Sequence, residues 1–384
     1  MAPVCPCEMM FPVYNRKQLH FTVPAMAFPG SLLIRRFLYG VSLLVLLLLF
    51  MPLQAAEKDA LVFFNWSEYM DPELVTKFEQ EYGVKLRQPF YDHDDNRTDL
   101  LLQTRTEGYD VVIVDTQSLA LYRKLGWLEP LDQARLPNLK HLDEKWLVGN
   151  DPYGAYSVPY FWGTTGIAYR KDLVDKVPDS WMDLFRPDAS LSGSIGMYRN
   201  TVDLVSAALK ALGYSINDRD PAHLDEVEAL LREQKPHVKT YDYPSLDEKS
   251  MLVTGDIKAG MFYNSDTLMV AEFNDNIEYR IPREGCAIWV DRLVVMKSSR
   301  NKDLAWKFIN FLMEPENAAQ LAEWTYGATP NRSARKLLPE AFLQDRVVFP
   351  TSEDLARCET AEPLPARIIK KRSRIVSEVV PPAQ

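Results

Sequence analysis

The chain has 384 residues, more than one hydrophobic core usually organises, so its length favours two compact units. Apolar residues make up 47% and charged residues 25%, an ordinary globular composition that excludes a disordered, collagen-like or coiled-coil chain. The net charge of −9 argues against a nucleic acid as partner, because phosphate binding needs clustered Lys and Arg, and it suits a cationic partner instead.

The N-terminal part has the features of an export signal. Arg35 and Arg36 are followed by an apolar run over residues 37–50 and then by Ala55 and Ala56. This order is typical of a secretory signal peptide, and the run is shorter than the roughly 20 apolar residues of a membrane-spanning helix. We expect residues 1–55 to be a signal peptide with an over-extended N-terminus, cleaved near Ala55 or Ala56, and the mature protein to be periplasmic.

Two cysteines remain after such cleavage. In an oxidising compartment, Cys286 and Cys358 are compatible with one disulfide. Two free buried thiols fit the sequence equally well, so the alternatives stay open at this point.

The first part of the chain alternates between strand and helix patterns. Leu61–Phe64 is an apolar strand, and Asp71, Pro72 and Glu73 have the order of a helix start, with the helix running toward Gly83. Residues 84–90 have a strand pattern, residues 98–106 a helical one and residues 109–114 another apolar strand.

The later part of the chain repeats this alternation of strands and helices after a change in amino-acid composition. An aromatic-rich segment over 152–162 leads into a crossing strand at 164–169, where we place the first hinge. A helix over 202–212 ends at Gly213, and residues 286–296 form a strand that returns toward the first unit. Residues 305–313 are an amphipathic helix. The alternation predicts mainly parallel, doubly wound sheets.

Common catalytic motifs are missing from the sequence. The chain lacks the nucleophile elbow, the phosphate-binding loop, the dinucleotide fingerprint and the zinc-protease motif. The four histidines beyond the signal are scattered without metal spacing, at His93, His141, His223 and His237. We expect no enzymatic activity, cofactor or metal. An exported hydrolase remains the alternative, because a glycosidase needs only two carboxylates far apart in sequence.

Aromatic residues repeatedly stand beside carboxylates. Trp289 and Asp291 share one face of their strand, because side chains alternate along a strand. Similar pairings occur over residues 66–69 and 263–266. A primary ammonium group needs a charge partner, and its methylene chain packs against apolar walls, so aromatic rings serve both. The pattern favours binding of an organic cation.

Each residue has an alternative interpretation when considered alone. Trp66 and Tyr69 are compatible with a core role. Asp203 follows Asn200 at the spacing of a helix cap. Asp266 and Asp291 fit solvated strand ends, and Tyr326, which precedes Gly327, fits a turn anchor.

Several segments together resemble one known family. Asn65–Tyr69, Trp289–Asp291 and Tyr326–Asn331 are similar to segments of the bacterial periplasmic spermidine and putrescine binding proteins of ABC transporters. The resemblance runs from about Leu61 to Leu338. It implies an α/β type II periplasmic-binding fold, in which two discontinuous lobes close over a ligand cleft. The lobe boundaries it implies are 56–165 with 290–335 for lobe 1 and 166–289 with 336–384 for lobe 2.

The resemblance also implies a set of ligand-binding residues. Most match the family pattern: Trp66, Ser67, Glu68, Tyr69, Asp203, Tyr263, Asp266, Trp289, Asp291 and Tyr326. Three departures occur, because Asp115 and Gln117 stand where the family has serine and an aromatic residue, and Asn200 stands where spermidine binders have an acid. Ligand length is therefore left open.

The sequence thus predicts capture of a linear polyamine of the putrescine, spermidine or norspermidine class. The partner is an ABC permease or, as the alternative, a membrane receptor of a cyclic-di-nucleotide pathway that reads the protein as a polyamine sensor. Binding of another small solute is a further alternative. The resemblance favours a monomer.

Overall fold

The computed structural model describes residues 60–148 and 155–381. The expected signal peptide, residues 1–55, lies outside the described residues. No helix within the described ranges is both long and apolar enough to cross a bilayer.

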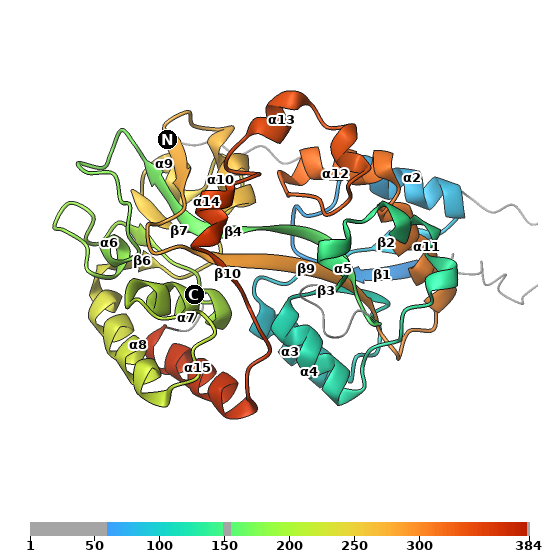
Figure 1. The fold of residues 1–384 in the computed structure, drawn as a ribbon, viewed down its shortest axis with the longest axis horizontal. Coiled ribbons are helices and arrows are strands. Elements are labelled where there is room, and N and C mark those ends of the chain that lie inside the picture. The colour runs from blue at the N-terminus through green and yellow to red at the C-terminus, as the bar shows by residue number, and fades with distance from the viewer. Residues whose placement is uncertain (1–59, 149–154, 382–384) are drawn as a thin grey trace, which may run out of the picture. The chain divides into compact units, whose positions relative to one another are not determined.

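One mixed β-sheet connects the described elements, in the order β2-β1-β3-β9-β4-β7-β5-β6, with β10 paired to β9 and β8 to β4 (Figure 1). The strands are β1 Ala60–Phe64, β2 Lys85–Arg87, β3 Val111–Val114, β4 Val158–Arg170, β5 Ile195–Gly196, β6 Val238–Thr240, β7 Ala259–Tyr263, β8 Ile277–Arg280, β9 Ala287–Val295 and β10 Glu359–Thr360.

Helices connect and cover the strands. They are α2 Pro72–Tyr82, α3 Asp94–Gln103, α4 Thr116–Leu125, α5 Glu144–Val148, α6 Met182–Phe185, α7 Thr201–Ala211, α8 Pro221–Gln234, α9 Met251–Thr254, α10 Asn264–Ala271, α11 Lys302–Leu312, α12 Pro315–Thr325, α13 Glu340–Gln344, α14 Ser352–Ala356 and α15 Ala366–Val379.

Local sequence explains where the first long helix begins and ends. In α2 the Asp71 side chain accepts a hydrogen bond of 2.7 Å from the backbone N–H of Glu73, and Pro72 occupies the first turn. The helix ends at Gly83, whose φ of 68° suits a residue without a side chain. Leu74 and Phe78, four residues apart, are buried on one face.

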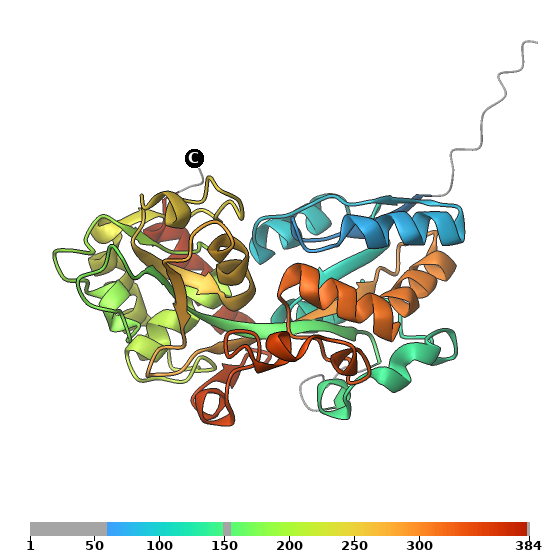
Figure 2. The same ribbon diagram turned by 90° about the horizontal axis from the view of Figure 1, so that it is seen from above.

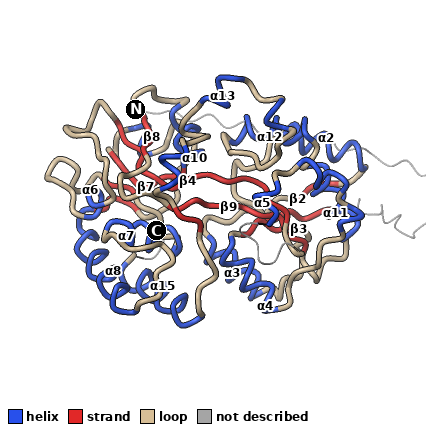
Figure 3. Tube along the Cα trace, viewed as in Figure 1, coloured by secondary structure: helices blue, strands red, loops and turns tan. Residues whose placement is uncertain are grey.

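Two long strands run through the middle of the sheet. β4 and β9 pair with each other in antiparallel fashion, and the pairing extends from Val158 with Leu293 to Thr164 with Ile288 (Figure 3). β9 pairs with β3 at one end, whereas β4 pairs with β7 and β8 at the other. These two strands therefore connect both halves of the sheet. The expected crossing strands are present.

The expectation of mainly parallel sheets is wrong at the centre. Strands β1, β2 and β3 pair in parallel, as do β5, β6 and β7, but all pairings of β4 with its neighbours are antiparallel. β4 runs from the first half into the second, and β9 returns from the second half to the first, so the two strands run in opposite directions. The sheet is therefore mixed.

Two hydrophobic clusters lie at the two ends of the sheet. The first includes Phe63, Phe78 and Phe308, and the second includes Trp181, Leu204 and Ile375. In Figure 2, blue and cyan segments lie beside orange ones in one half, and green and yellow segments lie beside red ones in the other. Each half thus combines early and late parts of the chain. The lobe boundaries given above remain our proposal.

A disulfide joins Cys286 and Cys358 across 72 positions of sequence. It lies next to the pairing of β10 with β9, where Glu359 is opposite Ala287. The two alternatives that the sequence left open are thus settled in favour of the disulfide. The late segment before α15 is attached to the start of β9.

Candidate functional site

A pocket opens where strand ends and helix starts of both halves meet. Its empty volume is about 870 Å³, part of it open to solvent. The lining residues are Trp66, Ser67, Glu68, Tyr69, Asp94, Asp115, Thr116, Val202, Asp203, Tyr243, Leu246, Tyr263, Ser265, Asp266, Met269, Ala287, Ile288, Trp289, Val290, Asp291, Thr325 and Ala361. The described lining contains no lysine, arginine or histidine.

Short connections place these side chains. Trp66 to Tyr69 follow the carboxyl end of β1, and Glu68 there has a left-handed φ of 55°. Asp115 follows β3, and Asp266 lies in the first turn of α10, directly after β7. Ligands in open α/β sheets bind at such carboxyl ends.

The crossing strand β9 supplies Trp289 and Asp291 to the same face. Trp289 lies opposite Gly163 of β4. A Cβ atom at Gly163 would lie 2.3 Å from the Trp289 ring and 2.2 Å from Oδ1 of Asn264. Glycine is therefore needed here for the close packing of the indole ring.

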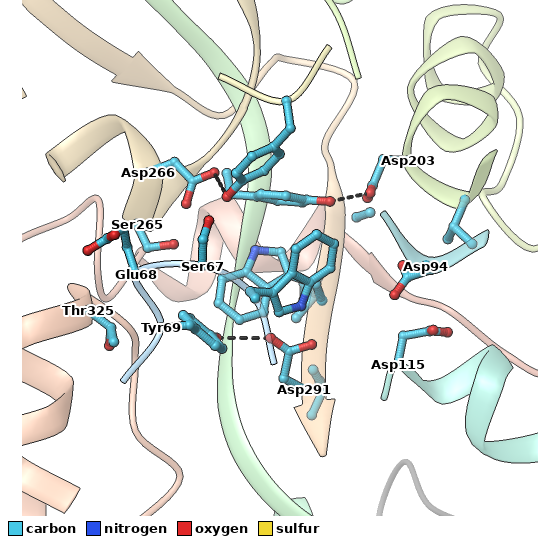
Figure 4. Close-up of a pocket in the computed structure, with 18 of the residues that line it drawn as sticks. Ser67, Glu68, Tyr69, Asp94, Asp115, Asp203, Ser265, Asp266, Asp291 and Thr325 are labelled. Atoms are coloured by element: carbon cyan, nitrogen blue, oxygen red, sulfur yellow. Dashed lines mark hydrogen bonds between the residues drawn. The ribbon is translucent and has the colours of Figure 1, made fainter. Parts of the chain in front are cut away.

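Tyrosine hydroxyl groups donate to three carboxylates of the pocket. Tyr69 donates to Asp291 at 2.9 Å (Figure 4). Tyr263 donates to Asp203 at 2.5 Å, and Tyr243 donates to Asp266 at 2.7 Å. Each of these carboxylates is thus held by a neutral donor.

Burial makes these carboxylates reluctant to ionise. It raises the pKa of Asp203 to about 7, the pKa of Asp266 to about 7 and the pKa of Asp291 to about 8. The hydrogen bonds from the tyrosines oppose this effect only in part. A cation that enters the pocket would favour the ionised forms.

The acidic groups are arranged on two sides of the aromatic rings. Figure 4 shows Asp94, Asp115 and Asp203 on one side, Glu68, Ser265 and Asp266 on the other, and Asp291 next to Tyr69. The negative charges of Asp94 and Asp115 raise the pKa of Asp203 further, which agrees with this grouping. The pocket therefore offers separated negative groups with flat apolar walls between them.

Ten of the thirteen sequence-predicted residues line this pocket: Trp66, Ser67, Glu68, Tyr69, Asp115, Asp203, Tyr263, Asp266, Trp289 and Asp291. The structure also decides one alternative. Asn200 caps α7 by accepting from the N–H groups of Val202 and Asp203, so the Asp203 carboxylate is free of the capping role.

The other three predicted residues lie outside the lining. Asn200 lines a neighbouring hollow, and its side chain donates to Asp94 at 2.8 Å. Gln117 donates its backbone N–H to Asp115 at the start of α4. Tyr326 has a φ of 51° at the end of α12, and its hydroxyl group donates to Glu272 in a neighbouring hollow.

Sequence reasoning missed twelve of the lining residues, among them Asp94, Tyr243 and Met269. Asp94 lies in a polar run, residues 92–95, that the hydrophobic pattern did not assign to a helix. Tyr243 lies in a connection between β6 and α9 that has no periodic pattern. An acid at a helix start is the one signal that pointed to Asp94.

The fold and the pocket agree with what comparison with known proteins finds. The family model for bacterial extracellular solute-binding proteins matches residues 73–351. The chain belongs to this family. Its type II periplasmic-binding fold and the resemblance noted from the sequence are thereby confirmed.

Individual relatives make the comparison more specific. This solute-binding protein is 31% identical to the spermidine/putrescine-binding periplasmic protein of Salmonella typhimurium over 307 residues, 79% of this chain and 87% of that protein. It is 30% identical to the norspermidine sensor of Vibrio cholerae over 351 residues, 91% of this chain and 95% of that protein.

A solved structure shows the same architecture. The spermidine/putrescine ABC transporter substrate-binding protein PotD of Streptococcus pneumoniae superposes with a TM-score of 0.69 at 30% identity. The match covers 84% of this chain and 98% of that one. Two of these relatives are named as binding proteins and one as a sensor. No group of three or more metal-ligating side chains was found among residues 60–148 and 155–381.

Proposed function

We propose that this solute-binding protein captures a linear polyamine in the periplasm, reversibly and without chemical conversion. The observation that carries the proposal is the pocket itself, where Asp203, Asp266 and Asp291 surround aromatic rings and no cationic side chain is among the described lining residues. Ammonium groups pair with carboxylates, and methylene chains pack on the rings.

The names of the relatives support the same ligand class. Spermidine, putrescine and norspermidine occur among them, in a transport context and in a sensing context. We propose that the loaded protein is read by a membrane partner, an ABC permease or a signalling receptor. Export with cleavage near Ala55 or Ala56, and a monomeric state, belong to the same proposal.

Calorimetric titration tests the ligand class. The protein is unfolded and refolded to remove carried-over ligand, then titrated with putrescine, spermidine, norspermidine and spermine. We expect saturable one-to-one binding of at least one of them and complete recovery of the ligand unchanged. Absence of heat with all four, from a folded sample, would contradict the proposal, and conversion of the ligand would favour a hydrolase.

Asp291→Asn is the decisive variant. It keeps the shape of the side chain and the hydrogen bond from Tyr69, but it removes the charge. Loss of one partner of a desolvated charge pair costs about 2 kcal/mol or more, which is roughly a 30-fold loss of affinity. Asp275→Asn is the matched control, because Asp275 is exposed and lies outside the pocket lining. This variant should bind the ligand with unchanged affinity.

A further inference from the structure

One arginine is buried behind the acidic side of the pocket. The Arg97 side chain is 1% exposed, and its guanidinium group lies 2.5 Å from Asp94 and 2.9 Å from Asp115. Both carboxylates line the pocket, whereas Arg97 does not. A fixed positive charge therefore stands directly behind two of the five aspartates that a ligand meets.

The guanidinium group has no donor left for a ligand. A guanidinium group has five N–H donors. In Arg97, which lies on α3, each of the five donates a hydrogen bond to another residue of the chain. The acceptors are Tyr122 for Nε, Tyr91 and Asp94 for Nη1, and Asp115 and Ser118 for Nη2. Arg97 thus acts on a ligand through its charge and through the two carboxylates that it holds.

Those two carboxylates are also engaged by other donors. Oδ1 of Asp115 accepts from the N–H groups of Gln117 at 2.7 Å and Ser118 at 3.0 Å. Oδ2 of Asp94 accepts from Asn200 at 2.8 Å. Asp291 has fewer donors than these two residues. Within the described part of the chain, its side chain accepts one hydrogen bond, from the hydroxyl group of Tyr69 to Oδ2. Arg97 therefore offsets one of the two negative charges on the Asp94 and Asp115 side of the pocket, and each of the four carboxylate oxygens there already accepts a hydrogen bond.

The titration behaviour of Asp115 agrees with this difference, whereas burial raises the pKa of Asp94 to about 6 despite the opposing charge of Arg97. Burial raises the pKa of Asp115, but the charge of Arg97 and hydrogen bonds from Ser118 outweigh it and leave the pKa below its usual value. Asp115 is thus ionised and paired within the chain. Asp203, Asp266 and Asp291 have raised pKa values, and their side-chain donors among the described residues are hydroxyl groups, including those of tyrosine and threonine, rather than arginine or lysine.

We propose that Arg97 determines ligand specificity by keeping ammonium groups away from the Asp94 and Asp115 side of the pocket. An ammonium group placed there would meet a like charge in a weakly polar site. The cationic groups of the ligand then pair with Asp203, Asp266 and Asp291. The inference rests on the proposed polyamine function.

Arg97→Met tests the inference through a ratio of affinities. The variant frees two carboxylates for an additional ammonium group, so it favours a ligand with more amines over one with two. We expect the ratio of the Kd for spermine to the Kd for putrescine to fall at least tenfold relative to the unsubstituted protein. A merely structural role of Arg97 would weaken both ligands alike and leave the ratio unchanged.

Two controls isolate the charge. Arg97→Lys keeps a cation at this place, and its ratio should stay within about threefold of that of the unsubstituted protein. The triple variant R97M/D94N/D115N removes the arginine together with both carboxylates, and its ratio should return toward the original value. Circular dichroism and a cooperative thermal transition establish that each variant is folded.

A second variant covers the case in which R97M does not fold. D94N/D115N leaves the arginine charge unopposed, so the same ratio should rise at least threefold. An unchanged ratio in a folded R97M or in D94N/D115N overturns the inference while the polyamine function stands. Failure of the unsubstituted protein to bind any polyamine overturns both, so the two failures are distinguishable.

Discussion

At the scale of single residues, neutral tyrosine hydroxyl groups hold the carboxyl groups that would bind a cation in the pocket. Tyr69, Tyr243 and Tyr263 each fix a buried carboxyl group that has a raised pKa. Amines of the lysine type keep their proton up to about pH 10. Loading the pocket therefore exchanges protons on the carboxyl groups for the positive charge of the ligand.

This exchange predicts a pH dependence of binding. Since the pKa values of Asp203, Asp266 and Asp291 are about 7, 7 and 8, affinity should rise from pH 6 to pH 8 and level off above it. Binding at pH 7 should release protons, which calorimetry in buffers of different ionisation enthalpy measures. A heat that is independent of the buffer would contradict the raised pKa values.

The same shifts affect the stability of the ligand-free protein. Carboxyl groups with raised pKa values bind more protons in the folded than in the unfolded state, where the pKa is about 4. The free energy of unfolding should therefore fall as pH rises from about 4 to 8. Bound polyamine supplies the missing countercharge, so this fall should be smaller in the complex.

Single residues of the pocket could be predicted where the local sequence pattern alone determines which way a side chain points. Trp289 and Asp291 share a face because strand alternation requires it, and both line the pocket. Asp94 was missed because its place depends on α3 beginning four residues before the predicted helix. Gln117 stays a predicted ligand contact that lies outside the described lining, where its backbone N–H donates to the N-cap residue Asp115.

At the scale of elements, the starts of α3 and α7 meet across the two halves. Asn200 donates to Asp94 at 2.8 Å, and the hydroxyl group of Thr201 donates to Asp95 at 2.7 Å. Both bonds join a helix of the first half to a helix of the second. They stabilise the arrangement in which the pocket is lined from both sides.

Thr201→Val removes one of these bonds and keeps the shape of the side chain. A net hydrogen bond contributes about 1 kcal/mol, so the arrangement becomes less favourable by roughly a factor of five. We expect ligand dissociation to be about three- to tenfold faster in stopped-flow measurements. Thr76→Val on the exposed face of α2 removes a hydroxyl group that bonds within its own helix, and it should leave the rate unchanged.

Elements with strong patterns were predictable, and pairings between distant elements were not. The helix expected to end at Gly213 is observed as α7, and the strand expected over 286–296 is β9. The direction of β4 relative to β7 depends on contacts between Thr165 and Tyr263, almost a hundred residues apart. Alternation of strands and helices along the chain does not contain this information.

At the scale of the whole molecule, negative charge gathers near the pocket. A neighbouring hollow shares Ser67, Glu68, Leu246 and Met269 with the pocket lining. Its described lining includes no lysine or arginine and contains six acids: Glu68, Asp71, Glu73, Asp247, Glu272 and Glu323. The net charge of −9 has the same sign. Such a field raises the local concentration of a cationic ligand.

Steering by this field predicts an association rate that depends on salt. The rate constant for polyamine binding should fall as ionic strength rises, because charges farther apart than about 8 Å are largely screened at 0.15 M. Replacing Glu272 and Glu323 by Gln should lower the association rate at least twofold at low salt with little effect on dissociation. The control replaces Glu107 and Glu316, which lie outside the hollow. Equal effects of the two pairs would mean that net charge, rather than the acidic hollow, guides the ligand.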